Sequence, residues 1–392
     1  MEESVKEKRT VRRKAKFKFF SIRSGIDMPF LCILLILLSI GLVMMFSASF
    51  AYGYYYYDDS YMFISSQALW AVIGLVMMFV VSYVDYHQLH KFAIPILALA
   101  VLLLFIALFM PAINYVHRWI IIPGLGQFQP SEIAKFALIL IFSHLISINY
   151  KKMGTFKVGI LPYAIILAMI VGLLLLEPHI SASVIMILIA AMLLFVGGVK
   201  IRWFVVAGAV VAAVLAYVIF FASDMGYASH RIDAWLDPFS NATQQIIDDT
   251  WQTRQSLYAI GSGDWLGVGL GQSRQKYLYL PEPQNDFIFA IVCEELGFIG
   301  AGIIIILFAL LVWRGIIIAL SARDKFGMLL GLGITFQVGI QVILNICVVC
   351  NTIPNTGISL PFFSYGGTSL VILLAQMGVL LSISRSSKLE KM

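Results

Sequence analysis

Acidic side chains gather in one short stretch of an otherwise apolar chain, LPEPQNDFIFAIVCEELGFIG at 280–300. If a helix begins near Asp286, this carboxylate lies at the water boundary, where it can ionise and act as a general base toward a polar head group. Glu282 then lines the rim of the same region. Glu294 and Glu295 lie two turns deeper, and we expect them to pair with polar groups on other spans, because an unpaired buried charge is costly.

A second polar group lies in GQFQPSEIAKF at 126–136. Pro130 suits the first turn of a helix, where its missing N–H is not needed. Glu132 then lies near the positive end of the helix dipole, and Lys135 follows three residues later on the same face. The two side chains either pair so that the helix can start in the membrane interface, or they form the polar wall of a substrate cavity.

Arginine and lysine side chains near these carboxylates are candidates for binding an anion. Arg118 stands between His117 and Trp119. It could anchor a helix end at the membrane interface, or its guanidinium could bind a phosphate through two parallel hydrogen bonds. A long loop that follows holds four further cations, which are Arg231, Arg254, Arg274 and Lys276.

Three other motifs carry a weaker signal. Glu177-Pro178-His179 fills a gap of only a few residues between two apolar runs, which favours a structural turn over a functional pair. The glycine-rich stretch 261–271 lacks the strand-then-helix context of a phosphate-binding loop, so we expect a turn or a close backbone approach there. Cys347 and Cys350 match CxxC within an apolar run, which predicts neither a disulfide framework nor a metal site.

The elements that must hold these residues are membrane helices. The 392 residues are 60% hydrophobic and only 12% charged, with a mean hydropathy of +0.92. Nearly continuous apolar segments of about 20 residues predict an all-α polytopic membrane protein. We expect ten transmembrane helices, at 29–49, 67–84, 93–110, 131–149, 160–176, 181–198, 203–222, 287–313, 327–350 and 366–384. The eighth of these runs is long enough for an extended or bent helix.

The distribution of lysine and arginine predicts the orientation of these helices. Ten spans put both termini on one side, and that side receives 21 of the 27 basic residues. Positive residues collect on the cytoplasmic side, so both termini are expected there. Nine of them lie in the N-terminal tail, where such a cluster attracts anionic lipid and predicts no nucleic-acid partner.

The domain organisation follows from the same pattern. We expect a basic cytoplasmic tail at 1–28, a ten-span membrane domain at 29–385 and a short cytoplasmic tail at 386–392. One large extracytoplasmic loop, 223–286, is expected to pack on the exterior face because it contains several tryptophans and tyrosines. Any chemistry is therefore expected on the extracytoplasmic side of a bacterial cytoplasmic membrane.

Six stretches of the chain form an ordered series of motifs from the third span to the last. They are HRWI at 117–120, FQPSEIAK at 128–135, SLYAIGSG at 256–263, GVGLGQS at 267–273, LPEPQNDFIFAIVCEELGFIG at 280–300 and GISLPFFSYGGTSL at 357–370. Together these motifs closely resemble the SEDS family (shape, elongation, division and sporulation proteins). The PEPQ form of the central motif and the basic tail are more similar to its FtsW/SpoVE branch than to RodA.

This resemblance implies a peptidoglycan glycosyltransferase that polymerises lipid II at the outer face of the cytoplasmic membrane. The family's essential aspartate maps to Asp286, and its other motif residues map to Glu132, Lys135 and Arg118. In the implied reaction, Asp286 accepts the proton of an acceptor sugar hydroxyl that attacks the donor anomeric carbon and releases undecaprenyl pyrophosphate. Arg118, Lys135 and either Arg231 or Lys276 would stabilise the pyrophosphate.

Two positions depart from the family pattern. Asn285 replaces the threonine that usually precedes the aspartate, and an amide can still form a hydrogen bond there. The family's PDxG motif reads Pro178-His179-Ile180-Ser181, which removes an acid. A function borrowed for that turn therefore does not transfer to this chain.

Partners, cofactors and competing functions complete these expectations. The resemblance implies a class B penicillin-binding protein, a single-span transpeptidase, as partner, with lipid II and membrane lipids as ligands. No cofactor is required by the sequence, although a divalent cation, Mg²⁺ or Mn²⁺, could bridge Asp286 and the pyrophosphate. The competing interpretations are a lipid II flippase, which needs a polar path across the whole membrane, and a scaffold that only recruits the transpeptidase.

Overall fold

The computed structural model describes residues 25–111, 117–122, 126–209, 235–239 and 244–387, and helices dominate them. Smaller elements are the helices η1 (Tyr150–Lys152) and α5 (Phe156–Gly159) and the strands β1 (Ile120–Ile122) and β2 (Gly126–Phe128), which pair antiparallel. The long helices are α1 (Met28–Tyr57), α2 (Met62–Tyr83), α3 (His87–Ala107), α4 (Pro130–Asn149), α6 (Leu161–Leu176), α7 (Ile180–Val196), α10 (Gln244–Ser262), α11 (Ile288–Leu320), α12 (Lys325–Val349) and α13 (Gly367–Ser386).

Eight helices in the described ranges are long and apolar enough to cross a membrane, and α7 is a shorter apolar helix of 17 residues. Helices suit this setting because they satisfy every backbone polar group internally where no water is available. The chain is therefore a multi-pass helical membrane protein, as the sequence predicts. The expected span 203–222 extends beyond the described residues, so the count of ten stays a prediction.

The two described ends of the chain lie at the same end of the bundle. The backbone N–H of Asp27, just before α1, donates to the hydroxyl of Ser384 near the end of α13, at 3.4 Å. Asp27 also receives two hydrogen bonds from the guanidinium of Arg314 in α11, at 2.9 and 3.0 Å. The start of α1 and the end of α13 therefore lie side by side, in agreement with the expectation that both termini are on one side of the membrane.

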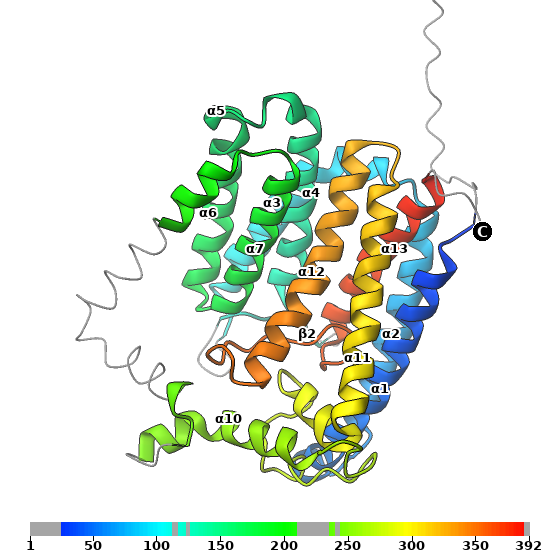
Figure 1. Cartoon of the computed structure of the whole chain (residues 1–392), viewed down its shortest axis with the longest axis vertical. Helices are drawn as coiled ribbons and strands as arrows, with labels where there is room; N and C mark the ends of the chain where they lie inside the picture. The colour runs from blue at the N-terminus through cyan, green and yellow to red at the C-terminus, as the bar shows by residue number, and fades with distance from the viewer. Residues whose placement is uncertain (1–24, 112–116, 123–125, 210–234, 240–243, 388–392) are drawn as a thin grey trace, which may run out of the picture.

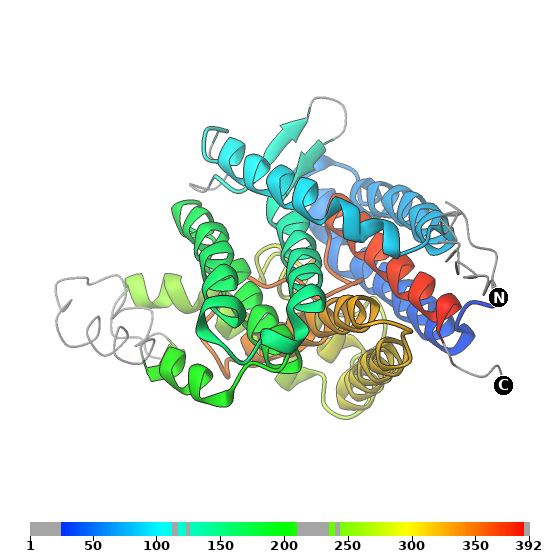
Figure 2. The same ribbon diagram turned by 90° about the horizontal axis from the view of Figure 1, so that it is seen from above.

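The helices pack in neighbouring pairs that bring distant parts of the chain together. α2 packs on α13, α3 on α4, and α11 on both α1 and α12 (Figures 1 and 2). α10 differs from the rest, because it lies across the opposite end of the bundle from α5 (Figure 1). The expected extracytoplasmic loop therefore contains a helix that covers one end of the bundle.

α11 is longer than the predicted eighth span and is interrupted. It runs from Ile288 to Leu320, and Gly297 within it has the non-helical angles φ 67° and ψ −172°. This break separates a first segment of about two turns from the rest of the helix. Asp286 lies two residues before that first segment, with Phe287 between them.

Candidate functional site

An uncharged side chain holds the backbone of Asp286, and a glycine lies close to its carboxylate. Its backbone carbonyl accepts a hydrogen bond from the side-chain amide of Asn345 in α12, at 2.7 Å. The loop 350–366 passes on the other side, where Gly357 has φ 63° and a Cβ at that position would lie 3.0 Å from Oδ2 of Asp286. Glycine is needed at 357 both for this backbone conformation and for the close approach to the carboxylate.

The residues before Asp286 are tied to the same loop. The backbone N–H of Tyr365 donates to the carbonyl of Gln284 at 2.8 Å, and the hydroxyl of Ser364 donates to the carbonyl of Asn285 at 2.7 Å. The Asn285 side chain donates in turn to the carboxylate of Glu282 at 2.7 Å. The departure from threonine at position 285 therefore supplies a hydrogen bond within the site.

The surroundings of Asp286 raise the pKa of its carboxyl toward neutral pH. Burial raises the pKa of the Asp286 carboxyl to about 6, the negative charge of Glu282 adds to the rise, and Arg118 opposes it. A general base works best when its pKa lies near the working pH, because it is then ionised and still binds a proton. Asp286 is partly exposed, so a substrate hydroxyl can reach it.

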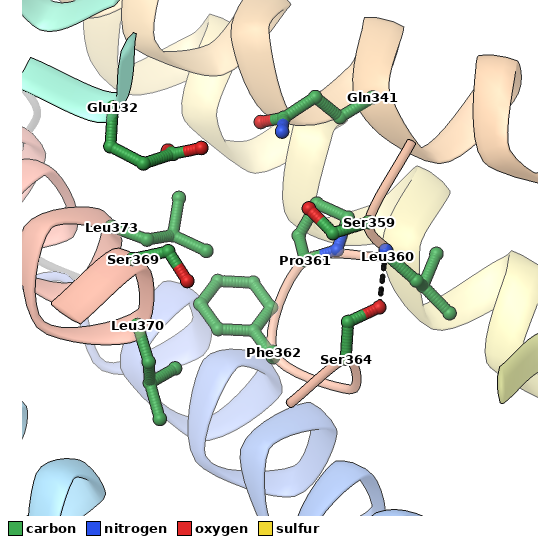
Figure 3. Close-up of a pocket in the computed structure, with 10 residues that line it drawn as sticks. All are labelled: Glu132, Gln341, Ser359, Leu360, Pro361, Phe362, Ser364, Ser369, Leu370 and Leu373. Carbon is green, nitrogen blue, oxygen red and sulfur yellow. Dashed lines mark hydrogen bonds between the residues drawn. The ribbon is translucent and has the colours of Figure 1, made fainter. Parts of the chain in front are cut away.

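A polar pocket lies next to this region, between three helices and the loop 350–366. Figure 3 shows the side chains of Glu132 from α4 and Gln341 from α12 pointing toward each other across it. Lys135 pairs with Glu132 at 2.9 Å, and both residues are buried. The pocket is lined by Glu132, Gln341, Ser359, Leu360, Pro361, Phe362, Ser364, Ser369, Leu370 and Leu373.

Arg118 contacts the turn between α6 and α7. Its guanidinium donates to the backbone carbonyls of Glu177, at 3.5 Å, and Pro178. The carboxylate of Glu177 is fully buried, and neither of its oxygens has a hydrogen-bond partner among the described residues. Burial raises the pKa of Glu177 to about 8, although Arg118 opposes the rise, so this carboxyl is largely protonated at neutral pH.

His179 in the same turn is also held neutral. Its side chain is buried, and burial lowers its pKa to about 3, with the positive charges of Arg118 and Lys135 acting in the same direction. The hydroxyl of Ser181 donates to the carbonyl of Thr356 and so joins this turn to the loop beside Asp286. The turn 177–181 thus borders the site, and its departures from the family pattern lie at this border.

The other candidate cations are arranged differently. Lys276 is buried and pairs with Glu295 at 3.0 Å, whereas Arg231 lies outside the described residues. The expectation that Glu294 and Glu295 pair with polar groups on other spans is only partly correct. Ser47 of α1 is such a group, but the two carboxylates also accept hydrogen bonds from residues 271–276, because this segment folds back over α11.

The uncharged side of the site, Gln341 and Asn345, was not predicted from the sequence. Gln337, Gln341 and Asn345 recur every four residues along α12 and therefore share one helix face. This row of amides in an apolar run was the available signal, and attention to ionisable residues alone does not find it. No group of three or more His, Cys, Asp or Glu side chains that could hold a metal ion occurs in the part of the chain that the structure describes.

Comparisons with known proteins give consistent matches along nearly the whole chain. The family model for FtsW, RodA and SpoVE, described as a cell cycle protein, matches residues 28–389. Stage V sporulation protein E of Bacillus subtilis (strain 168) is 40% identical over 368 residues, covering 92% of this chain and 98% of that protein. An FtsW of Geobacter sp. (strain M18), named as a probable peptidoglycan glycosyltransferase, is 39% identical over 364 residues, covering 92% and 97%.

Two solved structures share the fold. A chain from work on the structural coordination of polymerization and crosslinking by a peptidoglycan synthase complex matches with a TM-score of 0.75 and 25% identity, covering 92% of this chain and 98% of that chain. The rod shape determining protein RodA of Thermus thermophilus matches with a TM-score of 0.67 and 24% identity, covering 93% and 99%.

Proposed function

The chain belongs to the FtsW, RodA and SpoVE family of cell cycle proteins, and we propose on that premise that it is a peptidoglycan glycosyltransferase that polymerises lipid II. The observation that carries this proposal is the environment of Asp286. A partly exposed carboxylate with a pKa of about 6 lies at the start of a membrane helix, beside a polar pocket and an arginine. A substrate with a lipid tail in the membrane and sugars in water would meet such a base at the boundary.

The proposed reaction uses Asp286 as its base. The carboxylate accepts the proton of the 4-hydroxyl on one disaccharide while that oxygen attacks the anomeric carbon of another. The new glycosidic bond forms as the bond to the undecaprenyl pyrophosphate breaks, and the pyrophosphate carries away the electron pair. A positioned base of this kind contributes about 10²- to 10⁴-fold to the rate.

Arg118 and Lys135 are proposed to stabilise the negative charge of the leaving group. The guanidinium of Arg118 has five N–H donors, and two backbone carbonyls occupy only some of them. Lys135 lies in the wall of the same region, where its charge also acts on His179. Glu132 is proposed to hold Lys135 in place and to contact substrate hydroxyls through the pocket.

A divalent cation is proposed to assist the reaction without being essential for it. Mg²⁺ is typically held by one or two carboxylates together with substrate phosphates, so Asp286 and the neighbouring Glu282 fit this role without a preformed cluster. The cation would neutralise charge on the pyrophosphate. Removal of divalent ions with a chelator, followed by return of Mg²⁺ or Mn²⁺ alone, tests this part of the proposal.

We propose a class B penicillin-binding protein as the partner and the outer face of the cytoplasmic membrane as the place of reaction. One structural neighbour comes from a synthase complex that couples polymerization and crosslinking, which supports a transpeptidase partner for this chain too. The side is inferred from the 21 basic residues expected at the opposite face. The division or sporulation role follows the two relatives, FtsW and stage V sporulation protein E.

The decisive experiment is a polymerisation assay with purified protein, the partner and lipid II. We expect the wild type to make glycan chains and Asp286→Asn to make almost none, with an unchanged melting temperature. Undiminished chain synthesis by Asp286→Asn would overturn the role of Asp286. Absence of chains from the wild type, together with movement of labelled lipid II across liposomes, would instead favour the flippase.

A further inference from the structure

The segment that follows α10 docks into the break of α11. Residues 264–276, which we call the strap, approach α11 at Gly297, where the helix interrupts its own hydrogen bonding. Backbone groups of the strap replace the missing helical partners. These bonds run from Val268 N to Glu294 O (2.9 Å), from Gly269 N to Glu295 O (3.1 Å), from Phe298 N to Asp264 O (2.8 Å) and from Ile299 N to Trp265 O (3.2 Å).

The buried carboxylates of Glu294 and Glu295, next to the break, accept hydrogen bonds from the strap. Glu294 accepts a hydrogen bond from the backbone N–H of Arg274 at 2.9 Å. Glu295 accepts from the N–H groups of Gly271 at 2.9 Å and Ser273 at 3.2 Å. Both glutamates are only 1% exposed, so these charged acceptors are costly to leave without partners.

Lys276 supplies the positive charge that balances this arrangement. Its ammonium group donates to Glu295 at 3.0 Å, to the carbonyl of Gly271 at 2.6 Å and to the hydroxyl of Ser47 in α1 at 3.1 Å. A lysine ammonium has three donors, and these three partners use all of them. Lys276 is therefore engaged inside the protein and has no donor left for a pyrophosphate.

The ion pair between Lys276 and Glu295 joins the two ends of the segment 276–295, and Asp286 lies near the middle of that segment. Asp286 comes ten residues after Lys276 and nine residues before Glu295, and the first segment of α11 joins it to the glutamate. Any shift of the strap relative to the break therefore tilts or displaces the short helical segment that begins next to Asp286. The rest of α11, beyond Gly297, is attached to the bundle independently through Arg314 and Asp27.

We propose, resting on the function proposed above, that Lys276 and Glu295 are positioning residues that seat the strap in the break of α11 and so hold Asp286 in its productive place. Lys276 acts through Glu295 and the strap and does not touch substrate. The inference replaces the sequence-based idea that Lys276 stabilises the pyrophosphate. The two roles differ in their dependence on Glu295. Glu295→Gln keeps the charge of Lys276 and should spare a role at the pyrophosphate, whereas it should lower kcat if Lys276 acts through Glu295 and the strap.

The first test compares Lys276→Met, Glu295→Gln and the double variant in the polymerisation assay and in thermal melting. We expect each single variant to lower kcat about 10- to 100-fold, with KM for lipid II within about 2-fold, because small misplacements of a reacting group have effects of this size. The double variant should regain melting temperature, because no unpaired charge is left, without regaining kcat. Removal of the Arg314–Asp27 pair in Arg314→Met should lower the melting temperature and leave kcat unchanged.

The second test moves the strap without changing a charge. A Cβ at Gly267 would lie 2.2 Å from the carbonyl oxygen of Glu295, and this residue has φ +79°. Gly198, just after α7, has φ +90° and open space around it, so Gly198→Ala is a matched control for backbone strain. We expect Gly267→Ala, but not Gly198→Ala, to lower kcat about 10-fold and to speed hydrogen exchange at the amides of Phe298 and Ile299.

These outcomes separate the two proposals. Wild-type kcat in both Lys276→Met and Gly267→Ala, beside an inactive Asp286→Asn, would overturn the positioning role alone. A lowered kcat in Lys276→Met beside a wild-type kcat in Glu295→Gln and Gly267→Ala would also overturn it and would restore the pyrophosphate role. An active Asp286→Asn would overturn the proposed function of the site itself.

Discussion

The side-chain amide of Asn345 donates a hydrogen bond to the backbone carbonyl of Asp286 across 59 positions of sequence, at 2.7 Å. The same amide nitrogen donates to the carbonyl of Ile358 at 2.6 Å, and the Asn345 side chain is completely buried. One amide in the last turn but one of α12 therefore fixes both the backbone of the proposed base and the loop that faces its carboxylate.

Replacement of Asn345 by leucine should lower kcat of polymerisation by about 10- to 100-fold, because Asp286 is no longer held at a fixed backbone position. Each buried carbonyl left without its partner costs about 1–3 kcal/mol, so the melting temperature should fall as well. Gln376→Leu in α13 is the matched control, since this buried side-chain amide has no hydrogen-bond partner for either its nitrogen or its oxygen among the described residues. Equal kcat for the two variants would contradict the role of Asn345.

The pH dependence of kcat/KM should report the ionisation of Asp286. The base must be deprotonated to accept a proton, so activity should rise with pH and reach half its plateau near pH 6. Glu282→Gln removes a negative charge and should move this midpoint to lower pH, whereas Arg118→Met should move it to higher pH. If the midpoint of the pH profile is the same in the wild type and in both variants, Asp286 is not the titrating base.

The buried carboxyl of Glu177 should make stability depend on pH. Its pKa of about 8 in the folded protein lies above the unfolded value, so the folded state holds its proton more tightly. The resulting stabilisation is complete below pH 4.5 and is lost as pH rises toward 8. Glu177→Gln should therefore melt higher than the wild type by a margin that grows between pH 5 and about 8, and parallel melting curves would contradict this expectation.

Substitutions of Glu132 and Lys135 should show whether the pair only allows α4 to start in the membrane interface or also forms the polar wall of a substrate cavity. Lys135→Met leaves a buried carboxylate without its partner and should cost about 3–5 kcal/mol, whereas Glu132→Gln combined with Lys135→Met should restore most of the stability. If the pair contacts substrate, the double variant should be stable but should polymerise lipid II more slowly than the wild type. Full activity of the double variant would leave the pair with only the structural role.

Local features of the fold were predictable because they depend on neighbouring residues. Long apolar runs predict membrane helices wherever backbone groups lack water, and α4 begins at Pro130 as its sequence indicates. The start of α11 next to Asp286 was also expected within two residues. For the glycine-rich stretch 261–271 we expected a turn or a close backbone approach, and Gly267 makes a close approach to α11.

Other features depend on residues that meet only when the helices pack. Lys276 resembled a free exterior cation in the sequence, but Ser47, 229 positions away, and Glu295 enclose it. Glu177 lay in what looked like a simple turn, yet the fold buries it beside Arg118.

The amino-acid sequence by itself determined that the chain forms a bundle of membrane helices and that Asp286 lies where one of them begins, because hydropathy and helix signals act over a few residues. Tertiary structure alone decided which side chains surround that carboxylate. Asn345 and Gly357 reach Asp286 through helix packing, and their uncharged character leaves no mark in the charge pattern. The acidity of Asp286 is set by this burial and by charges from separate segments, so it exists only in the folded protein.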